Sequence, residues 1–579
     1  MRPAIRNAAA LLGALAAWTG AQANGQSSYV VAGIVVDSRS HQPLANARVS
    51  LALATARDQK LERVTNRDGR FAFAVSQAGK YSLQMIKPGY PPQAYKHANH
   101  PVVSSAIAVR EDQDTAHIVF DAVRGSAITG QIRDEDGDPV GNALVAIFRS
   151  LVVGGERKVV SRGSTRANAA GEFRLANLPQ GSYYVCAMGR PWFADSVIGL
   201  QESQQSMHQA LRNRSAPSAD PDSRRDEQTA ETPEAEPKYS ADPSFRGSAF
   251  FTTFYPDAPV VEEASLVRVG AGGEARVAIT LRLARAVTVK GTISAPGEMT
   301  GGRAALYKKI YDQYMQFLYS PVDHAGGAFA FPNVPPGSYE IVASSEAGSG
   351  AASWHIRQEV QVGASDVEVA LRPSQMASLA GHIVPQGEIP EPVTALSVFL
   401  LNDRGQGYRS GVAADGSFSL LLLVPGRYEI DVGPAEYTAA YLTNSSSEQL
   451  PLTLDIPSGD TLQRDLTVIH AASVIDGHAA QGGRPLVGAF VLLMPKDASQ
   501  RWAYRVDQTD SDGSYHLAAI PSGDYLLAAL STGEDVLYRD PKVAAAIKKI
   551  AKPVHVNAGE HLNLDVDVVD AATLSLPSS

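Results

Sequence analysis

The chain has 579 residues, with 51 lysines and arginines against 60 aspartates and glutamates, which gives a formal net charge of −9. This length predicts about three to six domains. The acidic balance argues against a general nucleic-acid-binding protein, which normally has a basic surface. A single cysteine excludes an intrachain disulfide framework and a cysteine-based zinc cluster.

The amino terminus has the features of a secretory signal peptide over residues 1–23. Arg2 and Arg6 precede an apolar run over residues 8–18, and a small-x-small cleavage pattern ends at Ala23. The run is shorter than the ~20 apolar residues that span a bilayer. We therefore expect export to the periplasm, the cell surface or the extracellular space, with no transmembrane segment after cleavage.

The rest of the chain is a repeat. A turn glycine is followed by an aromatic residue two positions later, by a second glycine ten positions later, and by a tyrosine two positions after that. The copies are Gly69, Phe71, Gly79 and Tyr81; Gly171, Phe173, Gly181 and Tyr183; Gly327, Phe329, Gly337 and Tyr339; Gly416, Phe418, Gly426 and Tyr428; and Gly513, Tyr515, Gly523 and Tyr525. A strand-like run upstream of each copy contains another glycine: Gly33, Gly130, Gly291, Gly381 or Gly477.

The motif predicts a turn, a strand, a second turn and a second strand. The first glycine supplies the positive φ of a tight turn. The usual Pro-x-Gly forms the next turn. Alternating apolar residues follow both turns, as half-buried strands require. The tyrosine is expected to bury its ring while its hydroxyl reaches a backbone group.

Asp-Gly-x-Phe followed by Pro-x-Gly-x-Tyr resembles the carboxypeptidase regulatory-like domain, a transthyretin-like and carbohydrate-binding-like β-sandwich. The resemblance implies an exported bacterial protein that contains this domain in tandem. The expected fold is all-β, with five tandem immunoglobulin-like/transthyretin-like antiparallel β-sandwiches and one disordered insertion.

The expected sandwiches cover residues 29–122, 125–285, 286–373, 377–469 and 471–570. The second contains the insertion, residues 203–247. Much of that insertion lacks large apolar residues and cannot offset its ordering entropy. The fifth contains a short helix near residues 540–550, with Pro541 in its first turn.

No catalytic constellation is present in the sequence. His97 and His100 lack an acidic partner at metal-ligand spacing, and the acidic run 134–138 reads as a hairpin turn, not a calcium loop. Cys186 lies within a strand and reads as a half-buried structural thiol. The sequence therefore predicts a protein that is not an enzyme, with no catalytic residue, no cofactor and no metal site.

Aromatic residues of the third and fifth units are the candidate ligand-binding residues. Tyr311, Tyr314 and Trp502 could stack on sugar rings if they face solvent. The alternative is that these rings belong to the core, because alternation alone does not show which side of a strand faces water.

The expected function is extracytoplasmic binding or structural interaction at the cell envelope. Analogy with similar sandwiches suggests a carbohydrate-binding or adhesin-like role, with a polysaccharide as partner. Two alternatives remain: an accessory component that docks an outer-membrane receptor or transporter through a strand edge, and an accessory subunit of a peptidase.

Overall fold

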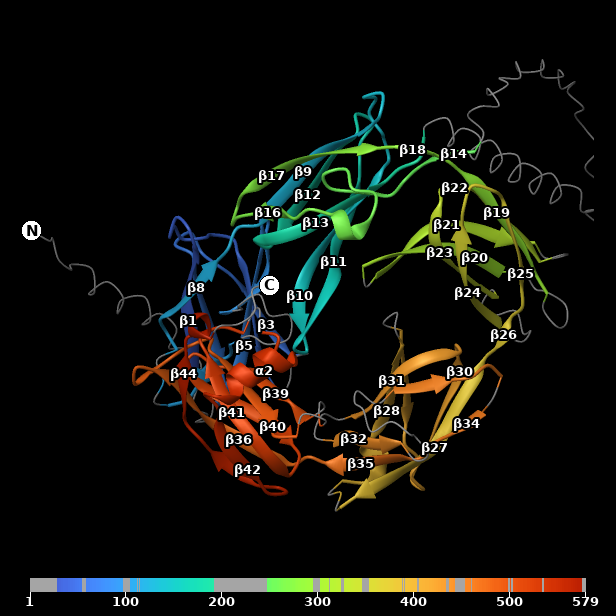
Figure 1. Cartoon of the computed structure of the whole chain (residues 1–579). Coiled ribbons are helices and arrows are strands. Elements are labelled where there is room, and N and C mark those ends of the chain that lie inside the picture. Colours follow the sequence, from blue (N-terminus) through green and yellow to red (C-terminus); the bar gives the residue numbers. More distant parts are fainter. Residues whose placement is uncertain are drawn as a thin grey trace, which may run out of the picture. The chain divides into compact units, whose positions relative to one another are not determined.

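The protein is seen in a computed structural model, which is drawn in Figure 1. It describes residues 29–574 apart from 55–58, 97–104, 112, 114, 192–246, 295–301, 312, 324–326, 346–353, 388, 390, 403–405, 434–436, 443–452, 460, 498–499, 501–502 and 534–535. The expected signal peptide and residues 203–246 of the expected insertion therefore lie outside the described residues. Two compact units are distinguished, Met1–Lys87 with Pro92–Tyr95 and Ala106–Ala122, and Pro88–Pro91 with Lys96–Ser105 and Val123–Ser579.

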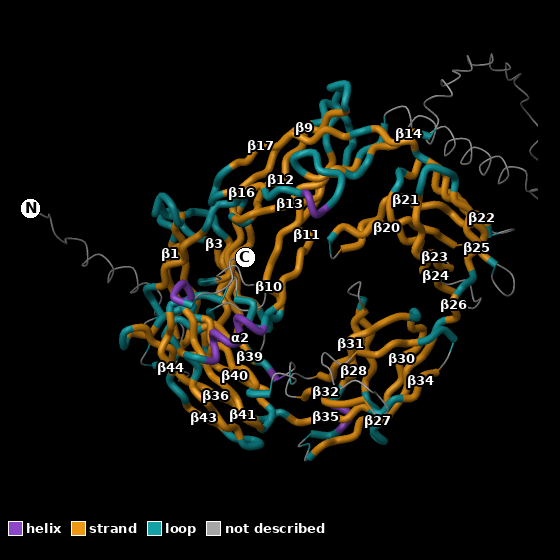
Figure 2. Tube along the Cα trace, viewed as in Figure 1, coloured by secondary structure: helices purple, strands orange, loops and turns teal. Residues whose placement is uncertain are grey.

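The described chain is all-β, as the sequence predicts. Strands dominate Figure 2, and helical structure is confined to short segments. These segments are η2 (Val261–Glu263), η3 (Val393–Ala395), α2 (Pro541–Lys548) and η5 (Ala571–Thr573).

The first unit contains the first sheet pair, except for the first two residues of β6, which fall in the second unit. One sheet has the order β4-β1-β8, and the other has the order β3-β2-β5-β6, with β7 also paired to β5. Its strands are β1 (Tyr29–Asp37), β2 (Arg48–Leu53), β3 (Lys60–Val64), β4 (Arg70–Val75), β5 (Gly79–Lys87), β6 (Tyr90–Ala94), β7 (Ile107–Val109) and β8 (Ile118–Ala122). Both sheets contribute fully buried residues, such as Val35 on β1 and Leu51 on β2.

The second sheet pair begins the second unit. Its sheets have the orders β12-β9-β17 and β11-β10-β13-β15, with β16 paired to β13, and a short sheet of β14 and β18 follows. The strands are β9 (Ser126–Asp134), β10 (Leu144–Val153), β11 (Glu156–Arg166), β12 (Glu172–Leu178), β13 (Gly181–Met188), β14 (Ser248–Phe250), β15 (Thr253–Phe254), β16 (Val267–Val269), β17 (Glu274–Leu281) and β18 (Leu283–Arg285). Ile128 and Val145 from opposite sheets share one core.

The third sheet pair has the orders β22-β19-β25 and β21-β20-β23-β24-β26. Its strands are β19 (Val287–Ile293), β20 (Gly302–Ile310), β21 (Gln313–Val322), β22 (Ala328–Val334), β23 (Gly337–Ser345), β24 (Trp354–Val362), β25 (Val367–Leu371) and β26 (Ser374–Gln375). Val289 and Leu306, again from opposite sheets, lie in its core.

The fourth sheet pair has the orders β30-β27-β35-β32, with β34 paired to β27, and β29-β28-β31-β33. Its strands are β27 (Ala377–Gln386), β28 (Ser397–Asn402), β29 (Gly407–Gly411), β30 (Ser417–Leu423), β31 (Gly426–Gly433), β32 (Tyr437–Leu442), β33 (Thr453–Ile456), β34 (Thr461–Gln463) and β35 (Leu466–His470). Leu379 and Val398 join the two sheets in one core.

The last strand group forms a continuous nine-stranded sheet with the path β37-β36-β44-β41-β38-β39, to which β40, β42 and β43 are also paired. Its strands are β36 (Ser473–Gln481), β37 (Arg484–Pro485), β38 (Phe490–Pro495), β39 (Arg505–Gln508), β40 (Ser514–Ile520), β41 (Gly523–Leu530), β42 (Lys552–Val556), β43 (His561–Asn563) and β44 (Val566–Val569). The short helix occurs where the sequence predicts it, and the Asp540 side chain caps it by accepting hydrogen bonds from Lys542 N and Val543 N. The division into five independent domains stays a prediction.

Antiparallel pairs predominate, as expected, but each group also contains parallel pairs, which the sequence did not predict. In each group, the strand that contains the upstream glycine pairs in parallel with strands near the end of that group: β1 with β8, β9 with β17, β19 with β25, β27 with β34 and β35, and β36 with β43 and β44. A hairpin cannot join two parallel strands, so the intervening chain passes through other strands of the group before it returns in the original direction.

The backbone conformation explains why both motif positions are glycine. The turn glycines have φ values from +63° to +83°, and the second glycines have φ values from +149° to +157°. Both ranges are poorly accessible to residues that carry a Cβ. Gly426, the second glycine of the fourth copy, has a φ of +152°.

The upstream glycine of each copy is explained instead by the close approach of neighbouring backbone. It lies directly opposite the aromatic residue of the motif in every copy: Gly33 and Phe71, Gly130 and Phe173, Gly291 and Phe329, Gly381 and Phe418, and Gly477 and Tyr515. A Cβ at any of these glycines would lie 1.7–2.5 Å from a backbone carbonyl oxygen of the neighbouring parallel segment. Only glycine allows this close approach.

The motif tyrosines behave as the sequence predicts. Each ring is buried, and each hydroxyl donates a hydrogen bond to the carbonyl oxygen four residues earlier. The bonds are Tyr81 to Gln77 at 2.9 Å, Tyr183 to Pro179 at 2.6 Å, Tyr339 to Pro335 at 3.0 Å, Tyr428 to Val424 at 2.7 Å and Tyr525 to Pro521 at 2.8 Å. Each tyrosine thereby fixes the turn that precedes its own strand.

Four copies also contain a bulge six residues after the turn glycine. Asn177, Asn333, Leu422 and Ala519 adopt φ values of 55–58°, and the strand register shifts beside each of them. Asparagine tolerates this conformation, whereas leucine and alanine adopt it at an energetic cost.

Candidate functional site

The candidate aromatic residues of the third sheet pair lie on the hairpin formed by β20 and β21. Tyr311 occupies the turn with φ of 54°, and Tyr314 follows at the start of β21. The strand register shifts between Leu306 and Tyr307. The alternation of inward-facing and outward-facing side chains is therefore interrupted within the hairpin. The structure therefore places these rings in different environments.

The Tyr311 ring packs against protein on several sides. Its centroid lies 5.3 Å from that of Phe148, 5.0 Å from that of Tyr184 and 6.0 Å from that of Phe254. The hydroxyl is buried and has no hydrogen-bond partner among the described residues, and burial raises its pKa. These contacts favour the core alternative that the sequence left open, and a role of Tyr311 in ligand binding stays a prediction.

Tyr314 is half-buried beside two cations. Lys309 Nζ lies 5.9 Å from the ring centroid, and Arg357 Cζ lies 5.7 Å from it. A cation over an aromatic face is favourable, so both side chains hold the ring in place. Its role in ligand binding stays a prediction.

Tyr319 is the exposed ring of this strand. The residue is 58% exposed, and Arg303 Cζ lies 5.6 Å from the ring centroid. It was not among the sequence candidates. Burial alternates over the second half of β21, so Tyr319 falls on the outward side between buried neighbours. The sequence indicates an alternating strand but does not show which of its residues face solvent.

Trp502 lies outside the described residues, so its role in binding also stays a prediction. Its neighbour Tyr504 stacks on Tyr538 with a centroid distance of 5.6 Å. Arg539 Cζ lies 5.8 Å from the Tyr504 ring centroid. This part of the fifth group therefore uses an aromatic side chain for packing.

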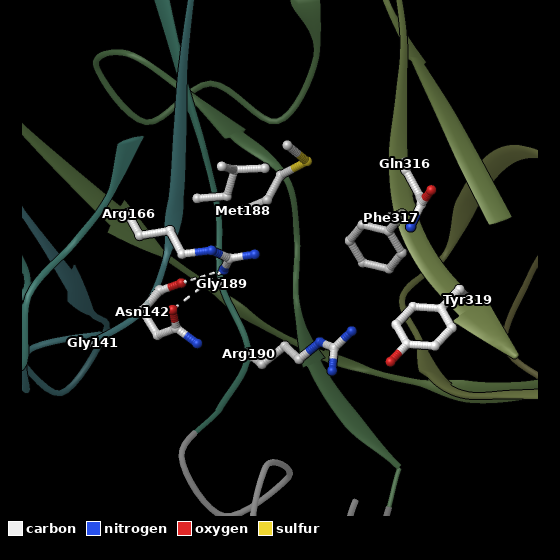
Figure 3. Close-up of a pocket in the computed structure, with 10 residues that line it drawn as sticks. Gly141, Asn142, Arg166, Met188, Gly189, Arg190, Gln316, Phe317 and Tyr319 are labelled. Atoms are coloured by element: carbon white, nitrogen blue, oxygen red, sulfur yellow. Dashed lines mark hydrogen bonds between the residues drawn. The ribbon is translucent and has the colours of Figure 1, made fainter. Parts of the chain in front are cut away.

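A cavity of about 280 Å³ lies between the second and third sheet pairs, within the second compact unit. We call it the two-arginine cavity, and Figure 3 shows both guanidinium groups directed into it opposite the rings of β21. Its lining consists of Gly141, Asn142, Leu144, Arg166, Met188, Gly189, Arg190, Gln316, Phe317 and Tyr319. The second sheet pair thus supplies the cations, and the third supplies the aromatic rings.

Beside this cavity, the contact between the two sheet pairs contains a buried amine and a buried thiol. Lys308 Nζ donates to Thr252 Oγ1 at 3.0 Å, and burial lowers the pKa of Lys308 to about 8. Cys186 is fully buried, not half-buried as the sequence suggested, and burial raises its pKa to about 12. Such a thiol is a poor nucleophile.

Histidine–carboxylate contacts are frequent in the last strand group. Asp476 contacts His516 Nδ1 at 2.8 Å and His561 Nε2 at 2.6 Å. Burial opposes ionisation of Asp476, but the hydrogen bonds from the two histidines lower its pKa. Within the described residues, no group of side chains is arranged to hold a metal ion.

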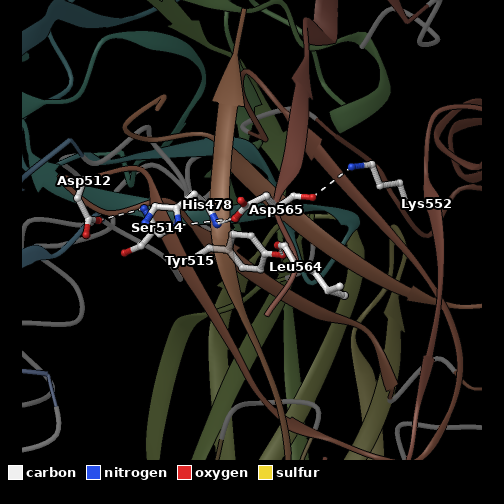
Figure 4. Close-up of polar contacts among 7 residues, drawn as sticks. All are labelled: His478, Asp512, Ser514, Tyr515, Lys552, Leu564 and Asp565. Carbon is white, nitrogen blue, oxygen red and sulfur yellow. Dashed lines mark hydrogen bonds and ion pairs between the residues drawn. The ribbon is translucent and has the colours of Figure 1, made fainter. Parts of the chain in front are cut away.

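Figure 4 shows a second set of polar contacts in the same group, which connects its neighbouring strands. Asp565 accepts a hydrogen bond from His478 N at 2.8 Å and lies 3.6 Å from its imidazole, while Tyr515 bonds to Leu564 O. Lys552 Nζ donates to Asp565 O at 3.1 Å. Ser514 N donates to Asp512 Oδ1 at 3.0 Å. These contacts fix strands and turns.

The remaining sequence candidates are placed as follows. His97 and His100 lie outside the described residues. The acidic run forms a hairpin turn, as expected, in which Asp134 Oδ1 accepts hydrogen bonds from Asp136 N at 3.1 Å and Asp138 N at 2.8 Å. In the part of the chain that the structure describes, no helix combines the length and apolar character required to cross a membrane.

A comparison with known families finds a match for the amino-terminal sandwich. Residues 30–119 match the family model of the carboxypeptidase regulatory-like domain. The first sheet pair is therefore similar to a carboxypeptidase regulatory-like domain. The match runs from the second residue of β1 to the second residue of β8, and it confirms the resemblance drawn from the motif. The four further copies share the glycine–aromatic pairing and the tyrosine hydrogen bond of this regulatory-like domain.

No curated protein matches the chain. Among solved structures, the Bacillus anthracis TIE protein is 10% identical with a TM-score of 0.16, and the match covers 77% of this chain and 76% of that one. A streptococcal ancillary pilin is 10% identical with a TM-score of 0.18, covering 60% and 99%. The minor pilin of Streptococcus agalactiae is 14% identical with a TM-score of 0.21, covering 32% and 96%. At such low scores nothing about function is taken from these likenesses.

Proposed function

We propose that this chain is a non-catalytic binding protein of the cell envelope and that its ligand is a polysaccharide. The regulatory-like domain supports a binding or structural role, because a sandwich of this kind presents loops and sheet faces on a rigid scaffold. The observation on which the proposal rests is the two-arginine cavity with the exposed Tyr319 at its edge.

The chemistry of that surface suits a sugar. The C–H faces of a pyranose pack on aromatic rings, and Phe317 and Tyr319 supply such rings from one strand. Amide groups of Asn142 and Gln316 can bond to hydroxyl groups. A concave site with apolar walls and a few polar groups is the usual form of a small-molecule site.

A pull-down against insoluble polysaccharides tests this function. Residues 24–579 should sediment with at least one polysaccharide, and Tyr319→Ala should reduce the bound fraction. Leu421→Ala is the matched control, because it removes an exposed apolar side chain, 67% exposed, from another sheet pair. Trp502→Ala and Tyr314→Ala test the two remaining sequence candidates in the same assay.

Absence of binding to every polysaccharide, together with capture of one defined outer-membrane protein, would replace this proposal with the docking alternative. An edge strand suits such docking. β3 lies at the end of its sheet and is exposed at all five residues. Its charged residues Lys60, Glu62 and Arg63 weigh against this alternative, however, because such charges discourage edge-to-edge pairing.

A further inference from the structure

The charged groups of the two-arginine cavity have one sign. Arg166 and Arg190 line it, and none of its described lining residues is an aspartate or glutamate. The chain as a whole has a net charge of −9, so this local excess of cations runs against the overall balance. A local cationic site in an acidic protein favours one kind of ligand group, an anion.

Within the described part of the chain, neither arginine uses all of its hydrogen-bond donors. Arg166 Nη1 donates to Asn142 O at 3.0 Å and to Asn142 Oδ1 at 3.3 Å, which fixes the guanidinium while its Nη2 keeps its protons. Arg190 forms no hydrogen bond or ion pair with the described part of the chain. A planar guanidinium matches the two oxygens of a carboxylate in a bidentate arrangement.

The opposite wall of the cavity indicates which kind of molecule carries the carboxylate. Phe317 and Tyr319 present ring surface across from the arginines, as Figure 3 shows, and the amide of Gln316 lies beside them. A free anion such as phosphate uses the cations but not the rings. A sugar that carries a carboxylate uses both walls, and about 280 Å³ is close to the lower limit of ~300 Å³ for ligand pockets, which suits a small ligand.

We propose that the two-arginine cavity binds a uronate residue of an acidic polysaccharide. Arg166 and Arg190 hold the carboxylate, the rings of β21 hold the sugar face, and the amides of Asn142 and Gln316 bond to its hydroxyl groups. This inference rests on the proposed function, because it names the ligand class of the same surface.

The experiment is a calorimetric or NMR titration of the full mature chain with a trimer of galacturonic acid and, as its neutral match, a trimer of galactose. The acidic trimer should bind roughly tenfold tighter or more, as expected for a charge-assisted bidentate contact. Arg166→Gln and Arg190→Gln should each weaken the acidic trimer by roughly tenfold and leave the neutral trimer nearly unchanged. Added salt should weaken the acidic trimer selectively.

Arg276→Gln is the matched control, because Arg276 is an exposed arginine on β17 that does not line the cavity. It should bind both trimers like the unchanged protein. Tyr319→Ala should weaken both trimers, which separates the role of the ring from that of the charges. Thermal unfolding of each variant verifies that the fold is retained.

Three results would overturn the inference. Equal affinity for both trimers would refute the assignment of a uronate as the ligand, while the proposal of polysaccharide binding would stand. An unchanged affinity in Arg166→Gln and Arg190→Gln would place the site elsewhere. Tighter binding of a peptide with a free terminal carboxylate, in competition with the trimer, would make the ligand a peptide. Trimer binding without retention on any insoluble polysaccharide would support the cavity assignment and refute the proposed function.

Discussion

Phe418 lies directly across from Gly381 in the antiparallel pair of β30 and β27, and a ring carbon of Phe418 lies 3.2 Å from the position that a Cβ of Gly381 would take. On its other side, Gly381 faces the carbonyl oxygen of Arg464. The glycine is therefore enclosed by an aromatic ring and by the neighbouring backbone. The same relationship recurs between Gly477, Tyr515 and the carbonyl oxygen of Leu564.

Gly381→Ala should strongly destabilise the fourth sheet pair. Its Cβ would lie 1.7 Å from Arg464 O, so the parallel segment must move, at a cost of about 3 kcal/mol. Gly411→Ala is the control, because a Cβ on that exposed strand residue meets no atom within 4 Å. Calorimetric unfolding measures both, and equal stability of the two variants would contradict the close approach.

Tyr428→Ala should lower the free energy of unfolding of the fourth sheet pair by about 3–5 kcal/mol, the range for a large buried aromatic. The residue is 1% exposed, and its hydroxyl bonds to Val424 O. Tyr428→Phe keeps the ring and should cost only about 1 kcal/mol. Tyr319→Ala removes an exposed ring and should leave stability nearly unchanged. A wild-type transition for Tyr428→Ala would refute the role assigned to the motif tyrosine.

Leu422→Asn should stabilise the fourth sheet pair by about 1 kcal/mol. Leu422 has a φ of 55° and is 61% exposed, so it bears the cost of a left-handed backbone with little burial in return. Asn177 and Asn333 occupy the same position of the bulge in other copies. Leu421→Asn changes an exposed neighbour outside the left-handed region and should have little effect. A lower melting temperature for Leu422→Asn would contradict this explanation.

The contact that contains Lys308 should become more stable as the pH rises above about 8. Burial lowers its pKa to about 8, below that of an unfolded lysine, so between these values the unfolded chain binds more protons than the folded chain. The burial cost is fully present below pH 8 and is relieved above it. The rise in melting temperature should disappear in Lys308→Met and persist in Lys309→Met, which alters an exposed neighbour. A rise that survives in Lys308→Met would assign the titration to another group.

Cys186 should not react with thiol reagents in the native protein. It is fully buried, its pKa is raised to about 12, and it packs in one cluster with Ile310 of the third sheet pair. Labelling should become complete in guanidinium chloride. Rapid labelling under native conditions would show that the second and third sheet pairs separate readily at this contact.

The local parts of the fold could be predicted because their causes lie close together in sequence. Tyr428 and its acceptor Val424 are separated by only four residues, and the motif predicted that the hydroxyl reaches a backbone group, although not which one. The sequence could not show why residue 381 must be glycine. The carbonyl oxygen that excludes a Cβ there belongs to Arg464, far along the chain. The parallel strand pairing was missed for the same reason.

The candidate site was harder to predict. The aromatic residues of the third unit were recognised as candidates, but the bulge beside Tyr307 and the turn at Tyr311 determine which rings face inward. Tyr311 packs in a cluster, whereas Tyr319 is exposed. Arg166 and Arg190 come from the second sheet pair and have no motif of their own, so only the packing of the second and third sheet pairs brings them opposite β21.

The parallel pairing of entering and leaving strands has a mechanical consequence. In the first sheet pair, the chain enters through β1 and leaves through β8, which lie side by side and run in the same direction. Tension applied to the two ends therefore slides these strands past each other and loads their hydrogen bonds together, so they cannot open one at a time. We expect each such group to resist stretching until the whole set of bonds ruptures at once, a response governed by the unfolding rate under force. Under such tension the chain would extend in discrete steps, one for each group that ruptures.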